Sequence, residues 1–120
     1  MQSCCNTAKF LAVRLGTVED KYFPDDETSF DQLKGRIQST IEFLQTVDEQ
    51  AMDGAEDKPV LMEIRAMGNY KFSSGSSYAA DFAMPYFYFH LSSAYCILRH
   101  LGVPLSAFDY VGADVFVKAG

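Results

Sequence analysis

The chain has 120 residues, of which 48% are hydrophobic, 14% aromatic and 22% charged, and its formal net charge is −6. This length predicts a single domain over residues 1–120, and the hydrophobic fraction is typical of a globular protein. The negative charge argues against nucleic-acid binding, which requires a basic face. No segment has the ~20 consecutive apolar residues that a membrane-spanning helix needs. We therefore expect a globular protein that binds neither nucleic acid nor a membrane.

The amino-terminal segment lacks the basic stretch and long apolar run of a secretory signal, so we expect a cytoplasmic protein. It has three cysteines, Cys4, Cys5 and Cys96. An odd number of cysteines in such a chain predicts reduced thiols, and the adjacent pair lacks the C-x-x-C spacing of zinc or redox sites. We expect all three to be small buried or half-buried apolar side chains, with a regulatory vicinal pair as the alternative.

Two amphipathic helices are predicted in the first half of the chain. Apolar residues of segment 2–15 recur at the spacing of one helix face, and Gly16 is the expected stop. The second helix is predicted to run to about Val47. At its start, Ser29 and Gln32 match the S-x-x-Q capping box, in which each residue satisfies a backbone amide of the other.

Two polar loops are predicted, at residues 17–28 and 48–58. Each contains an acidic run, at 24–27 and 53–57. Runs of like charge usually form solvated surface, so we expect both acidic runs to face water.

The spacing of apolar residues changes to alternation at 59–66 and 69–73, which predicts a short β-hairpin with its turn around Gly68. A lone hairpin is marginal in water, so it must pack against the helices. Residues 78–100 are strongly apolar and contain Pro85. We predict one long kinked helix there, because proline removes a backbone hydrogen bond without necessarily ending the helix.

These elements predict a mainly α-helical bundle with a small β-hairpin insert. The long helix is apolar around most of its circumference, which is typical of a helix covered on several sides at the centre of a bundle. Three helices offer few neighbours, so the chain needs a further covering surface. The tail over 105–120 is predicted to contain turns and an apolar patch formed by Val111, Val115, Phe116 and Val117.

The two histidines do not form a metal motif. His90 and His100 are ten residues apart, about 280° around a helix, so they do not face one pocket. A helical zinc site would show a second ligand four residues from His90, where the chain has Tyr86 and Ala94. His90 is interpreted as a hydrogen-bonded core histidine or a pocket residue, and His100 as a cation at the helix terminus.

An aromatic cluster at residues 86–89 gives the strongest candidate site. Tyr86, Phe87 and His90 are predicted to share a helix face with Ser93 and two alanines. Small residues beside aromatic ones can leave a pocket into which a hydroxyl and an imidazole converge. The alternative is a packed core whose polar tips bond to backbone or water.

The segment FAMPYFYFHLSSAYCILRHLGVPLSAFDYVG (82–112) resembles the carboxyl-terminal signature of an uncharacterised family in the DinB clan, the domain of unknown function numbered nineteen-ninety-three. PDDETSFDQLKGRI (24–37) and MDGAED (52–57) resemble its middle blocks. NTAKFLAVRLG (6–16) resembles the end of its second helix. The resemblance covers about residues 2–112 and implies a DinB-like, up-down four-helix bundle.

Many members of the clan bind a divalent metal through three histidines, and some use thiols in transfer or isomerisation. The resemblance places one of these histidines at His90, with Tyr86 at its companion position. No histidine precedes His90, so the histidine triad is incomplete. We therefore predict no cofactor, and a bound divalent metal is the alternative. Met84 and Tyr86 also differ from the leucine and asparagine usual beside the proline, which alters the pocket.

Family members carry a further amino-terminal helix, so this chain resembles three helices of a truncated four-helix bundle. Either the gene model starts late, or a partner helix or second copy replaces the missing helix. Our leading hypothesis is a cytoplasmic protein that binds a small apolar or aromatic ligand near His90 and Tyr86. The alternatives are a metal- or thiol-dependent transferase or isomerase, and a non-catalytic module completed by a partner or by self-association.

Overall fold

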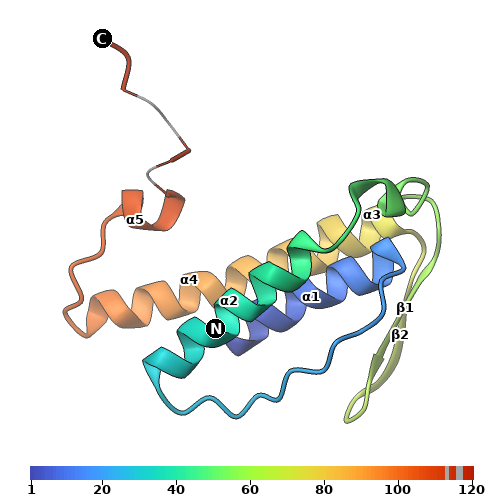
Figure 1. Cartoon of the computed structure of the whole chain (residues 1–120), viewed down its shortest axis with the longest axis horizontal. Helices are drawn as coiled ribbons and strands as arrows, with labels where there is room; N and C mark the ends of the chain where they lie inside the picture. The colour runs from blue at the N-terminus through green and yellow to red at the C-terminus, as the bar shows by residue number, and fades with distance from the viewer. Residues whose placement is uncertain (113, 116–117) are drawn as a thin grey trace.

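The computed structural model describes residues 1–112, 114–115 and 118–120, and it is mainly helical, as the sequence predicted (Figure 1). The long helices lie alongside one another, with the hairpin at one end and α5 with the carboxyl terminus at the other. In chain order, the elements are α1 (Gln2–Gly16), α2 (Phe30–Gln45), the 3-10 turn η1 (Glu49–Met52), β1 (Val60–Ile64), β2 (Gly68–Phe72), α3 (Gly75–Ser77), the π-helical segment η2 (Tyr78–Ala83), α4 (Met84–His100) and α5 (Ala107–Val111).

Helix α1 is the central helix of this fold. It packs against both α2 and α4. Its buried side is made of small or paired residues, which lets the neighbouring helices approach closely. These residues are Cys4, Cys5, Thr7, Lys9, Ala12 and Gly16.

The expectation that the long apolar helix lies at the centre is wrong. None of the described residues of α4 is buried, because α1 covers one side of α4 and the hairpin reaches only the beginning of the long helix. Met84, Tyr88 and Ile97 are 53%, 50% and 58% exposed. An ordinary protein surface exposes single, scattered apolar side chains, whereas α4 exposes several on one helix. The partner helix or second copy that the sequence predicted stays a prediction.

Helix α2 begins at the predicted cap. The Ser29 hydroxyl accepts a hydrogen bond from the Gln32 amide at 3.2 Å. The reciprocal half of the capping box is displaced by one residue, because the Gln32 side-chain oxygen accepts from the backbone and hydroxyl of Thr28 instead of from Ser29. The helix therefore begins where the sequence predicts. The backbone amide that Gln32 satisfies is that of Thr28, whereas the prediction was Ser29.

The loop before α2 is held by a buried arginine. The side chain of Arg36 is 3% exposed. Its Nη1 donates to the Pro24 carbonyl at 2.8 Å and to Glu27 at 3.0 Å, and its Nη2 donates to Asn6 at 2.7 Å and pairs with Asp25 at 3.1 Å. One guanidinium therefore joins α1, α2 and the loop between them.

A second buried cation holds the same loop from α1. Lys9 pairs with Asp20 at 2.6 Å and donates to the Lys21 carbonyl at 2.9 Å. Asp25 and Asp26 are exposed, as expected for a solvated acidic run at 24–27. The expectation is wrong for Glu27, whose side chain is 9% exposed, because the buried cation on α2 needs a counter-charge. The acidic residues of the run at 53–57 are exposed, as expected.

The β-hairpin is antiparallel, with Val60 opposite Phe72 and Ile64 opposite Gly68. Its connection is the three-residue segment 65–67, so the turn precedes Gly68 instead of including it. Gly68 has a φ of 95°, a left-handed conformation that glycine adopts without strain. The alternation predicted for β1 holds, since every second residue from Val60 faces the helices.

The long helix continues through Pro85, as predicted. The preceding segment η2 is π-helical, and the Met84 amide bonds to the carbonyl of Ala79, five residues earlier. A wider turn removes the clash that a proline ring causes with the carbonyl four residues before it. Gly75 begins α3, and a Cβ at this position would collide with the carbonyl oxygen of Ala55. The 48–58 loop can therefore pack this closely against α3 only because residue 75 is a glycine.

The segment after α4 forms a short helix where the sequence predicted only turns. Ser106 and Asp109 form a complete capping box for α5, and the Ser106 amide and hydroxyl lower the pKa of Asp109. Val111 and Val115 are 51% and 67% exposed. The other two residues of the predicted apolar patch, Phe116 and Val117, lie outside the described residues.

All three cysteines are free, as predicted, but their surroundings differ. Cys4 and Cys5 are buried, and burial raises the pKa of the Cys4 thiol because the thiolate would lose its hydration. Cys96 is exposed, so the expectation of a buried or half-buried residue is wrong there. In the part of the chain that the structure describes, no helix combines the length and apolar character needed to cross a bilayer.

The first prediction concerns the Arg36 cluster. Arg36→Met should lower the free energy of unfolding by about 2–4 kcal/mol, because it removes the cation shared by two carboxylates and an amide oxygen. Lys34→Met is the matched control, since Lys34 is 80% exposed and 4.0 Å from Asp31. Urea unfolding measures both. Equal losses in the two variants would show that the Arg36 cluster does not hold the fold.

The second prediction follows from Glu27, whose pKa is lowered first by the Gln2 amide and then by its own backbone and Arg36. Such a group binds fewer protons when folded, so its contribution is complete above its unfolded pKa and is lost as the pH falls through its folded pKa. Unfolding free energy should therefore decline below about pH 4.5. The decline should be shallower in Glu27→Gln than in the exposed control Glu19→Gln. Parallel curves would contradict this prediction.

Candidate functional site

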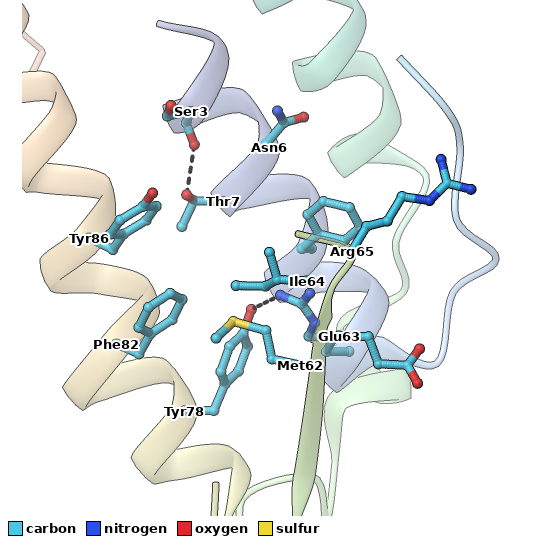
Figure 2. Close-up of a pocket in the computed structure, with 12 residues that line it drawn as sticks. Ser3, Asn6, Thr7, Met62, Glu63, Ile64, Arg65, Tyr78, Phe82 and Tyr86 are labelled. Carbon is cyan, nitrogen blue, oxygen red and sulfur yellow. Dashed lines mark hydrogen bonds between the residues drawn. The ribbon is translucent and has the colours of Figure 1, made fainter. Parts of the chain in front are cut away.

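A cavity of about 330 Å³ lies between α1, β1 and the helix formed by η2 and α4 (Figure 2). Helix α1 forms one wall, the hairpin a second wall and the aromatic residues of the long helix a third. The residues that line it are Ser3, Asn6, Thr7, Phe10, Arg14, Met62, Glu63, Ile64, Arg65, Tyr78, Phe82 and Tyr86.

The aromatic wall is a row of rings at four-residue intervals. Tyr78 and Phe82 have ring centroids 6.0 Å apart, and Phe82 and Tyr86 are stacked at 5.1 Å with 15° between their planes. The row ends at His90, whose ring meets Tyr86 edge-on at 4.5 Å. Residues four apart lie on one face of a helix, so the spacing of these four residues is a sequence signal for the row, and the predicted site includes its Tyr86–His90 end.

Tyr78 forms the closed end of the row. It is fully buried at 0% exposure, and its hydroxyl accepts a hydrogen bond from Arg14 Nη1 at 2.8 Å. The Arg14 guanidinium lies 4.7 Å from the ring centroid of Phe10 and 5.5 Å from that of Tyr78. A cation held against two rings is partly shielded from water, which strengthens its interaction with any charge that enters the cavity.

The hairpin supplies the apolar wall opposite the rings. Alternation along β1 turns Met62 and Ile64 toward Tyr78 and Phe82, while Glu63 and Arg65 extend away from them at the rim (Figure 2). Met62 is buried with Tyr78 in one apolar cluster. The sequence predicted that the hairpin must pack against the helices, but it gave no signal for the helix that receives it.

The structure separates the residues predicted for the site. Tyr86 lines the cavity and is 41% exposed. His90 lies one turn beyond it, and its Nε2 is buried without a hydrogen-bond partner among the described residues. Phe87 instead lines a hollow of about 180 Å³ that also includes Ala8. The Ser93 hydroxyl donates to a backbone carbonyl of its own helix.

The surroundings of His90 do not supply the donor set of a metal site. Its described ring neighbours are Tyr86 and Phe89, at centroid distances of 4.5 Å and 5.0 Å. Within the described ranges, no three residues of the types His, Cys, Asp and Glu come close enough to hold a metal ion. The side chains around His90 therefore do not fit the three-histidine centre that the resemblance implies, and Tyr86 faces the cavity instead.

Comparison with known proteins agrees with the sequence resemblance. Residues 1–111 match the model of the family described as domain of unknown function (DUF1993). The crystal structure of a DinB family member protein from Shewanella denitrificans matches this chain with a TM-score of 0.80 at 30% identity. The match covers 98% of this chain and 66% of that one, so this chain spans slightly less than two thirds of its length. No curated protein matches the chain.

The third prediction tests the closed end of the cavity. Tyr78→Phe removes the acceptor of the Arg14 hydrogen bond and should lower the free energy of unfolding by about 1–3 kcal/mol, since Arg14 loses a charge-assisted bond in a shielded position. The control is Tyr88→Phe on the same helix, where the side chain is 50% exposed and the loss should be close to zero. Thermal and urea unfolding report both values. Indistinguishable variants would mean that the Arg14–Tyr78 bond adds no stability.

Proposed function

The chain belongs to the DUF1993 family, and we propose that it binds a small aromatic or apolar molecule in the cavity beside Tyr86. The observation that carries this proposal is a cavity of about 330 Å³ with a row of stacked rings on one side and an apolar hairpin wall on the other. Ligand sites are concave, mostly apolar and about 300–1,000 Å³ in volume, with few polar groups to fix orientation. The cavity lies at the lower end of that range, which favours a small ligand.

The accessible part of the row determines how a ligand would bind. Tyr78 is fully buried, Phe82 is half-buried and Tyr86 is 41% exposed, so the rings become more accessible along the helix. A flat aromatic molecule can stack on Phe82 and Tyr86 while Met62 and Ile64 cover its other face. Aromatic contact of this kind adds about 0.5–1.5 kcal/mol to the gain from burying apolar area.

His90 contributes indirectly in this proposal. Its ring contacts Tyr86 edge-on and limits the orientations that the tyrosine can adopt. His90 is therefore a positioning residue, and replacing it should weaken binding less than replacing Tyr86 does.

The free thiols of Cys4, Cys5 and Cys96 support a cytoplasmic location, which we propose together with this function, since oxidising compartments favour disulfides.

The fourth prediction uses 2-naphthamide, an uncharged flat aromatic probe, and measures its dissociation constant by ligand-observed NMR. Tyr86→Ala should weaken binding about tenfold, because it removes both the stacking partner and the apolar area beside the probe. Tyr88→Ala is the matched control: the same side chain, two residues further along α4 and 50% exposed, does not line the cavity. Its dissociation constant should stay within about twofold of the wild-type value.

His90→Ala should weaken binding by an amount between those of the two tyrosine variants, and more than His100→Ala, which changes an exposed residue at the end of α4. Equal losses in Tyr86→Ala and Tyr88→Ala would contradict the proposed site. The proposed function would be contradicted if neither 2-naphthamide nor its anionic counterpart 2-naphthoate showed saturable binding.

A further inference from the structure

We propose that the ligand of this cavity is an aromatic carboxylate, whose anionic group is bound by Arg14. This inference rests on the proposed function and adds the chemical class of the ligand. Its starting point is a comparison among the cations of the chain. Lys9, Arg14 and Arg36 are the arginine and lysine side chains that are not exposed, and all ten such residues are described.

Two of these three cations have carboxylate partners. Lys9 pairs with Asp20, and Arg36 pairs with Asp25 and Glu27. The Arg14 side chain takes part in none of the ion pairs formed by the described residues, and its only hydrogen bond to a described residue goes to the neutral Tyr78 hydroxyl. A partly desolvated cation is normally matched by an opposite charge, so Arg14 is the exception among the three.

The unmatched charge faces the cavity. Arg14 lines it at the end closed by Tyr78, and its Nη1 is fixed by the tyrosine hydroxyl. The remaining guanidinium donors are arranged in a planar fork, which suits the two oxygens of a carboxylate. Glu63 is the acidic residue among the lining side chains, and it extends away from Tyr78 at the rim (Figure 2). A ligand carboxylate would therefore supply the counter-charge that the described chain does not supply.

The ring row determines what the carboxylate is attached to. Phe82 and Tyr86 extend the wall from the Tyr78 end toward solvent, so a flat ring bonded to the carboxylate would stack on them. An aliphatic acid would contact these rings without adding a further aromatic pair. A neutral aromatic molecule would shield Arg14 further without supplying a charge, which is unfavourable. The combination of one unmatched cation and a stacked wall favours an aromatic carboxylate over either of these.

The test compares 2-naphthoate with 2-naphthamide, which has the same ring system and nearly the same shape but no charge. Wild-type protein should bind 2-naphthoate at least about tenfold more tightly at low salt, and the ratio should fall as salt is added. Arg14→Met should bring the two dissociation constants within about twofold of each other, while Arg99→Met, which changes an exposed arginine that does not line this cavity, should preserve most of the ratio.

The outcomes separate this inference from the proposed function. Equal binding of both probes by wild-type protein would overturn the carboxylate inference and leave the aromatic site intact. Failure of both probes to bind would overturn the proposed function. Acetate binding as tightly as 2-naphthoate would show an anion site that does not use the rings, which also overturns the inference. Arg14→Lys retains the charge and should keep part of the ratio, so the inference stays testable if Arg14→Met does not fold.

Discussion

The buried phenol of Tyr78 is the contact on which the rest of the structure depends. It packs with Val60 and Met62 of the hairpin, meets the ring of Phe72 at 5.2 Å and accepts a hydrogen bond from Arg14 of α1. One side chain therefore joins the hairpin, the central helix and the long helix. Because a two-stranded hairpin is marginal alone, its position over the cavity follows from this attachment. Both the wall and the closed end of the candidate site are consequences of it.

A second constraint is electrostatic and acts where α1 and α2 meet the loop between them. Arg36 and Lys9 are buried, and each draws carboxylates of the loop between α1 and α2 onto the helices. Burying a charge is costly unless it is paired and hydrogen-bonded, so the loop sequence is restricted by the cations beneath it. The loop is therefore part of the helical packing. The same reasoning makes Arg14 unusual, because its side chain is shielded without such a partner.

The elements of the fold were predictable because they depend on local pattern. Helix spacing, the Ser29 cap and the alternation of Val60, Met62 and Ile64 are short-range signals. Of the residues predicted for the site, Tyr86 is the one that lines this candidate cavity, since the cavity is formed by residues brought together from α1, the hairpin and η2. Hydrophobic periodicity predicts the apolar face of a helix but not which element covers that face. For this reason the prediction that α4 lies at the centre of the bundle is wrong. Acidic runs likewise do not reveal the buried cations that they neutralise.

The arrangement of the cavity explains how it could discriminate between ligands of similar shape. Accessibility rises from 0% at Tyr78 to 41% at Tyr86, so a molecule entering beside Tyr86 would present its leading group to Arg14. Rings accept many flat molecules with similar affinity, and an apolar wall alone separates them poorly. A shielded guanidinium separates them better, because a neutral leading group removes water from the cation without replacing its hydrogen bonds. The rings would then supply most of the contact area and Arg14 most of the selectivity.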